Sequence, residues 1–157
     1  MARNVSRALS FEQGLQRAAA LCSQSEHCVA DITEKLLRWG ISREDSDRIV
    51  DRLIDEKYID ESRYALAYVR DKVRFSHWGR VKIKSMLRML RISEQDISNA
   101  FDLFDEDEYL AVLESVIETK RRSLPEADSY ASRVKLIRFA LQRGFEMHEI
   151  TKFISEY

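Results

Sequence analysis

Apolar residues recur at helical spacing along almost the whole chain. Steps of three and four residues separate, for example, Val29, Ile32, Leu36 and Trp39. Such steps place side chains on one face of an α-helix. Only four Gly and one Pro occur in 157 residues, and sheets joined by tight turns need more of both. The pattern therefore predicts an all-α fold of about nine helices.

Residues with strong end preferences mark several helix boundaries. Ser10 followed by Gln13 predicts a capping box at the start of the first helix. Gly40 and Gly144 each follow a run of helical spacing, which is where a glycine ends a helix. Pro125 is predicted to lie in the first turn of a later helix, because proline fits that position.

An internal repeat organises the predicted helices. The segment Arg80-Val81-Lys82-Ile83 recurs 53 residues later as Arg133-Val134-Lys135-Leu136. The first third of the chain joins the series through Gly40, which corresponds to Arg91 and Gly144. We therefore expect three three-helix repeats, at residues 1–57, 58–104 and 105–157. Each repeat is too small to be stable alone, so we expect an elongated tandem array.

Charge is strongly segregated along a chain whose net charge is only −1. Residues 70–91 hold eight basic side chains and one acidic side chain, whereas residues 101–118 hold seven acidic side chains and no basic one. Alternating blocks of this kind indicate a surface that meets a patterned, charged partner. The alternative is ordinary solvated helix faces whose charges cancel in three dimensions.

The most basic segment predicts a stripe of cations. At about 100° per residue, one side of the helix near residues 79–91 holds Arg80, Lys84, Arg88 and Arg91. Ile83 and Leu87 fall on a separate apolar face. Together with the preceding helix, the predicted contact residues are Arg70, Arg74, Arg80, Lys84, Arg88 and Arg91. Such a row suits phosphates or an acidic protein groove. The isoelectric point of 6.3 favours a protein partner, which can itself hold nucleic acid.

No catalytic or cofactor-binding motif is present in the sequence. The four glycines are isolated, so there is no glycine-rich phosphate loop. Cys22, His27 and Cys28 lack the number and spacing of a zinc site. We expect neither metal nor cofactor, and two reduced thiols in a cytoplasmic protein. The longest apolar run has six residues, Tyr64–Val69, far short of the ~20 that a membrane span needs, and the first residues do not read as a secretory signal.

Residues 53–65, which end in Tyr-Ile-Asp-Glu-Ser-Arg-Tyr-Ala, resemble the signature of the RecX family. Lys35-Leu36 followed by Gly40 also resembles that family, as does the spacing of Gly79, Ile83, Leu87 and Ile92. The length, the helical pattern and the tandem units extend the resemblance over nearly the whole chain.

Two residues depart from the family pattern. Cys28 stands where the family usually has Ser, which predicts a weak N-cap on the helix that follows. Arg91 stands where the family usually has Gly, so that helix is expected to end in another way.

The resemblance implies a bacterial regulator of the RecA recombinase without enzymatic activity of its own. Members of the family bind the RecA–DNA filament and limit strand exchange, ATP hydrolysis and repressor self-cleavage. We expect a monomer whose partner is the RecA filament, with single- or double-stranded DNA as a further candidate ligand. Two alternatives remain open: a direct DNA-binding module, since three-helix units resemble helix-turn-helix cores, and a scaffold for another partner.

Overall fold

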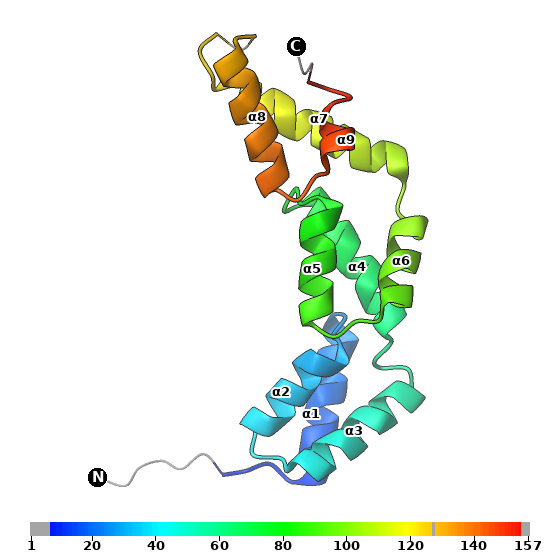
Figure 1. The fold of residues 1–157 in the computed structure, drawn as a ribbon. Helices are drawn as coiled ribbons and strands as arrows, with labels where there is room; N and C mark the ends of the chain where they lie inside the picture. The colour runs from blue at the N-terminus through cyan, green and yellow to red at the C-terminus, as the bar shows by residue number, and fades with distance from the viewer. Residues whose placement is uncertain (1–6, 127, 155–157) are drawn as a thin grey trace, which may run out of the picture. The chain divides into compact units, whose positions relative to one another are not determined.

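The computed structural model describes residues 7–126 and 128–154, and within them the chain forms nine α-helices and no strand (Figure 1). The all-α prediction is confirmed. The helices are α1 (Phe11–Gln24), α2 (Val29–Arg38), α3 (Arg43–Asp55), α4 (Glu61–Arg74), α5 (Arg80–Met89), α6 (Glu94–Leu103), α7 (Glu106–Arg122), α8 (Tyr130–Gln142) and α9 (Met147–Ile150).

The turns after α2, α5 and α8 share a feature of their backbone. Each contains a residue in the left-handed region of backbone space, namely Gly40 (φ 83°), Arg91 (φ 59°) and Gly144 (φ 96°). The apolar side chain that follows each of these residues is buried: Ile41, Ile92 and Phe145. The correspondence of the three positions in the sequence therefore reflects one repeated turn, and α5 ends with Arg91 in the conformation that glycine usually takes.

Most of the predicted helix starts are confirmed. Ser10 and Gln13 form the capping box of α1. Cys28 makes no side-chain capping bond at the start of α2. Short polar side chains begin the first helix of the next two trios, since Asp60 accepts from the backbone N–H of Arg63 (3.0 Å) and Asp105 from that of Glu108 (2.8 Å).

The start of α8 was predicted wrongly. Pro125 does not lie in this helix, because Glu126 adopts a left-handed backbone (φ 52°) that no right-handed helix can contain. The helix begins instead at Tyr130, and the hydroxyl of Ser129 accepts a bond from the backbone N–H of Ser132 (3.2 Å). The last helix is also shorter than predicted by the apolar spacing of Ile150, Phe153, Ile154 and Tyr157, and Tyr157 lies outside the described residues.

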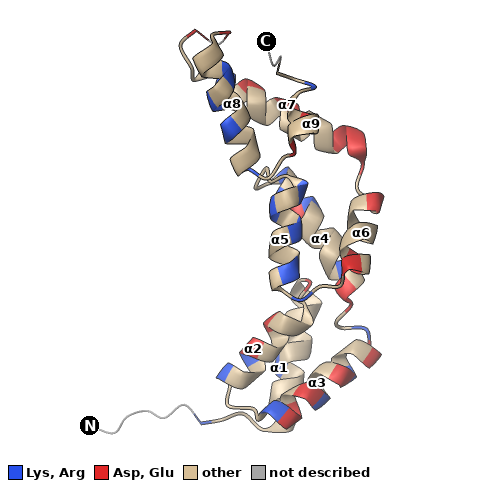
Figure 2. Cartoon of the chain, in the orientation of Figure 1, with Lys and Arg blue, Asp and Glu red and all other residues tan. Residues whose placement is uncertain are grey.

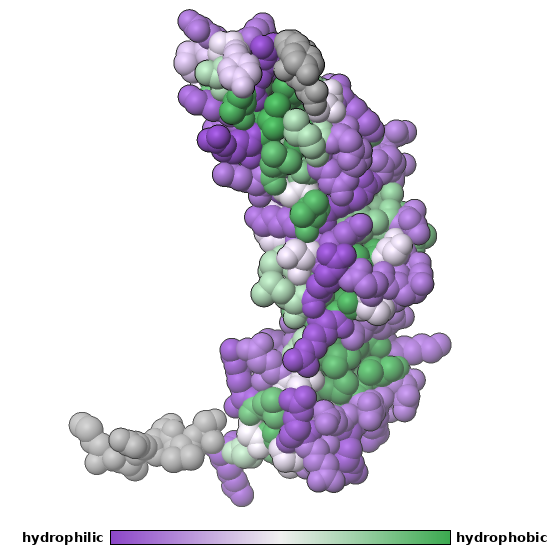
Figure 3. All heavy atoms as spheres, in the orientation of Figure 1, coloured by the Kyte–Doolittle hydropathy of each residue, from purple (hydrophilic) through white to green (hydrophobic). Residues whose placement is uncertain are grey.

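The described chain divides into two compact units. One unit comprises the residues up to Tyr64 together with Leu90–Ile92, and the other comprises Ala65–Met89 and the residues from Ser93 onward. The core of the first unit lies among α1, α2 and α3 and consists of Leu15, Ala18, Ile32, Leu36, Ile41, Ile49, Val50, Leu53 and Ile59. On the face drawn in Figure 3, apolar side chains reach the surface only in patches between hydrophilic ones.

Within the second unit, backbone atoms join the start of α5 to the turn after α8. The N–H of Gly79 donates to the carbonyl of Arg143 (2.7 Å), and the N–H of Val81 donates to the carbonyl of Gly144 (3.0 Å). A Cβ atom on Gly79 would lie 2.3 Å from the carbonyl carbon of Gly144. This Gly79–Gly144 joint therefore requires glycine at position 79, since no larger residue permits so close an approach.

A buried ion pair lies beside the joint. The Arg80 side chain is 18% exposed, and its Nη1 donates to Oε2 of Glu149 (2.6 Å), which is 1% exposed. The hydroxyl of Tyr109 donates to Oε1 of Glu149 (3.3 Å) and accepts from the backbone N–H of Arg80 (3.0 Å). Burial raises the pKa of the Tyr109 phenol, so its hydroxyl keeps the proton that it donates. Arg80 thus balances the charge of Glu149, the buried carboxylate of α9.

We predict that Gly79→Ala lowers the free energy of unfolding by about 3 kcal/mol, because the added methyl forces two backbones apart. Gly14→Ala is the matched control. Its Cβ would meet the flexible end of Ile41 at 2.9 Å, and the gain in helix propensity of about 1 kcal/mol offsets that contact. Urea denaturation measures both variants. If both variants lose the same free energy of unfolding, the close approach of the two backbones at Gly79 does not exist.

Arg91→Gly is expected to raise the free energy of unfolding by about 1 kcal/mol, because glycine adopts a left-handed backbone without the Cβ penalty. Arg91→Ala removes the same guanidinium but keeps the penalty, so it separates the two effects. If the Gly variant is no more stable than the Ala variant in thermal denaturation, the left-handed assignment fails.

Arg80→Ala is expected to cost about 3 to 5 kcal/mol, because it leaves Glu149 buried and unpaired. Arg80 also pairs with Glu106, whose side chain is 56% exposed. Glu106→Gln should therefore cost less than about 1 kcal/mol. Chemical denaturation of the two variants checks this difference, and similar losses would refute the structural role of the buried pair.

Candidate interaction surface on helices α4 and α5

The six cations predicted to contact a partner do not lie in one row of free charges. Arg80 is committed to Glu149 and Glu106, and its guanidinium lies 4.1 Å from the ring centroid of Tyr109. Helical spacing groups Arg80 with the other cations of α5, but it describes that helix alone. The carboxylate partners of Arg80 come from α7 and α9. Ile83 and Leu87 are buried as the apolar face of α5 predicts.

Arg74 and Arg88 also form two-pronged pairs inside the second unit. Arg74 donates from Nε (2.6 Å) and Nη2 (3.1 Å) to the carboxylate of Glu108. Arg88 donates in the same way to Glu94, at 2.6 and 3.2 Å. These bonds lower the pKa of both Glu108 and Glu94, so the carboxylates stay charged. Figure 2 shows the acidic start of α7, which supplies Glu108.

The remaining three cations differ in their surroundings. Lys84 is half-buried with its Nζ 5.4 Å from the ring centroid of Phe101. Arg70 is exposed and takes part in none of the ion pairs found among the described residues. Whether any of the six touches a partner stays a prediction.

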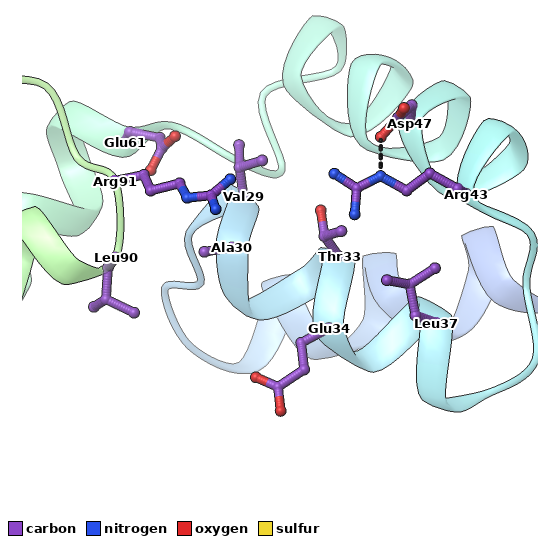
Figure 4. Close-up of a pocket in the computed structure, with 10 residues that line it drawn as sticks. All are labelled: Val29, Ala30, Thr33, Glu34, Leu37, Arg43, Asp47, Glu61, Leu90 and Arg91. Atoms are coloured by element: carbon purple, nitrogen blue, oxygen red, sulfur yellow. Dashed lines mark ion pairs between the residues drawn. The ribbon is translucent and has the colours of Figure 1, made fainter.

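Arg91 belongs to the first unit, where it lines a pocket of about 460 Å³ beside α2 (Figure 4). Val29 and Leu37 contribute apolar surface to this pocket, and the Arg43–Asp47 ion pair (3.7 Å) lies on its α3 side. Acidic and basic side chains both line the pocket, so its charge does not select one class of ligand.

A different pair of cations converges on one aromatic ring. Lys72 of α4 and Lys82 of α5 place their Nζ atoms 4.7 and 4.4 Å from a ring centroid of Trp78. Phe75, at 79% exposure, lies in the same connection. We call Lys72, Phe75, Trp78 and Lys82 the Trp78 surface. It combines cations without a carboxylate partner among the described residues and aromatic carbon, which are the features of a protein-binding patch.

The contact set predicted from the sequence contains neither Trp78 nor the two lysines. The available signal was their position, six residues before and four residues after Trp78 in the most basic segment of the chain. Helical spacing within either helix could not reveal the convergence, because the two lysines come from different helices.

No group of three or more His, Cys, Asp and Glu residues is placed to hold a metal ion in the part of the chain that the structure describes. Over the same residues, no helix is long and apolar enough to cross a membrane. Burial raises the pKa of the Cys28 thiol to about 11, so this cysteine is protonated and a poor nucleophile near neutral pH.

Two family descriptions match consecutive parts of the chain. Residues 60–100 match the second three-helix domain of RecX, and residues 106–154 match the third. These ranges contain the Trp78 surface, the Gly79–Gly144 joint and the buried Arg80–Glu149 pair.

Curated relatives carry the same family name. A regulatory protein RecX from Leuconostoc mesenteroides is 26% identical over 136 residues, which is 87% of this chain and 51% of that protein. One from Clostridium tetani is 26% identical and is covered over 58% of its length, so the chain spans little more than half of these two relatives. One from Pelodictyon phaeoclathratiforme is 29% identical over 85% of this chain and 81% of its own.

Solved structures agree in fold. The crystal structure of RecX from Lactobacillus salivarius superposes with a TM-score of 0.79 at 23% identity, over 91% of this chain and 93% of that one. A second crystal structure, of a regulatory protein RecX, gives a TM-score of 0.76 at 21% identity. With the domain matches and the shared helical architecture, these findings show that the chain belongs to the RecX family.

Proposed function

We propose that this chain binds the RecA–DNA filament and mainly inhibits recombinase activity, as a cytoplasmic, non-enzymatic, monomeric regulator of DNA recombination, repair and the SOS response. The observation that supports the proposal is the match of residues 60–100 and 106–154 to two RecX domains, together with relatives named regulatory protein RecX. That name supports a regulatory role, and RecA as the target is the proposal.

The proposed organisation is three modules, at residues 1–57, 58–104 and 105–157, that work in tandem. A row of small helical modules can contact several repeats of a filament at once, so each contact can be weak while the sum is strong. This fits a chain in which no single cavity dominates the described surface.

The contact surface on the second module is proposed to be the Trp78 surface, with Arg70 and Lys84 beside it in the sequence. Arg74, Arg80 and Arg88 contribute less, because their charges are already balanced by Glu108, Glu149 and Glu94. A cation that leaves an internal carboxylate must first break that pair. Lys82 leaves only the ring of Trp78, and Lys72 leaves the rings of Trp78 and Tyr68.

The test is a titration of the purified chain into RecA that hydrolyses ATP on single-stranded DNA. We expect hydrolysis to slow at near-stoichiometric ratios. In the Lys72→Gln/Lys82→Gln variant, the concentration for half-inhibition should rise about tenfold, which corresponds to roughly 1.4 kcal/mol of binding free energy.

Arg38→Gln/Arg52→Gln is the matched control for that variant. It removes the same charge from exposed positions on α2 and α3, where each arginine has only a glutamate on its own helix or at its end. It should inhibit as the unmodified chain does. Unchanged ATP hydrolysis at several-fold excess of the unmodified chain over RecA would refute the proposed function itself.

A further inference from the structure

A second basic surface lies between α7 and α8, away from the predicted stripe. A hollow of about 300 Å³ there is lined by apolar surface from Val116 and Phe139 and by the cations Lys120 and Arg143. A smaller hollow of about 170 Å³ shares Lys120 and Phe139 and is lined by Lys135 and Arg138 as well. We call the two together the α7–α8 groove.

The cations of this groove are not neutralised internally. Lys120, Lys135, Arg138 and Arg143 take part in none of the ion pairs found among the described residues. No Asp or Glu lines either hollow. The groove therefore differs from the start of α5, where Arg80 has its carboxylates in place, and it attracts an anionic ligand.

The floor of the groove discriminates between anionic ligands. Val116 is 6% exposed, and the ring centroid of Phe139 lies 5.0 Å from Nζ of Lys120 and 5.2 Å from Cζ of Arg143. Two cations lie beside this ring, so a ligand that packs against the ring also meets their positive charge. An apolar floor also gives a phosphodiester backbone nothing to bury, whereas it suits an aliphatic side chain.

We infer that the α7–α8 groove binds an acidic peptide segment of a partner protein that carries one large apolar side chain. The apolar side chain enters beside Val116 and Phe139, and neighbouring carboxylates pair with Lys120 and Arg143 at the rim. Further carboxylates reach Lys135 and Arg138 along α8.

This inference goes beyond the proposed function, because the groove lies on the third module, with only His77 contributed by the second, and because it does not need RecA to be the partner. The probe is a fluorescein-labelled peptide with one leucine among glutamates and aspartates, and its binding to the full chain is followed by fluorescence anisotropy. We expect saturable binding that weakens about tenfold when alanine replaces the leucine, because the apolar contact is lost.

Two substitutions at Thr119, which lines the larger hollow, test whether the peptide enters that hollow without changing its charge. Thr119→Trp places a bulky ring over the hollow and should abolish peptide binding, whereas Thr119→Ala leaves the hollow open and should retain it. Circular dichroism checks that both variants stay helical. Peptide binding that survives Thr119→Trp would overturn the inference.

The cations along α8 are tested with Lys135→Gln/Arg138→Gln, which should weaken binding of the acidic peptide several-fold at low salt. The competing ligand is a labelled oligothymidylate. If the oligonucleotide binds the unmodified chain more tightly than the peptide and loses affinity in this variant, the groove is a nucleic-acid site and the peptide assignment is wrong.

Discussion

The close approach of two backbones at Gly79 and Gly144 is the constraint on which the second unit depends. Two backbone hydrogen bonds cross this joint, and each is lost if a side chain at position 79 separates the chains. Beside the joint, the Arg80–Glu149 pair and the Tyr109 hydroxyl satisfy the polar groups that the contact buries. A contact built from backbone leaves little freedom for adjustment. The α4–α5 pair and the α7–α9 trio are therefore parts of one compact unit.

The same contact explains how charges that are segregated in sequence are used in the fold. The basic block before and within α5 meets the acidic start of α7, so Arg74 pairs with Glu108 and Arg80 with Glu106. For these residues the charges cancel in three dimensions, as ordinary solvated faces do. The cations left over lie elsewhere, at the Trp78 surface and in the α7–α8 groove. In the proposed function, a partner is attracted by these remaining cations and not by the net charge of each block.

Local signals made the helices predictable, because a cap or a terminating turn involves residues only a few positions apart. Ser10 predicted a capping box, Gly40 a helix end, and the repeat placed Arg91 at a position where glycine is expected. Pro125 misled because a favourable first-turn residue does not reveal the left-handed backbone that follows it. The ion pair of Arg80 with Glu149 could not be predicted from the spacing within α5, since the two residues lie 69 positions apart in the sequence. The convergence of Lys72 and Lys82 on Trp78 could not be predicted for a similar reason, because the two lysines lie on different helices.

The claim that the Gly79–Gly144 joint unites the second unit is tested most directly by native-state hydrogen exchange. The amides of Gly79 and Val81 donate across the joint, so they report on it individually. If the account is correct, both exchange only in the opening reaction that also exposes the buried amides of α7 and α8. If both exchange at a much lower free energy, while the amides of α7 and α8 stay protected, the joint opens by itself and the account is contradicted.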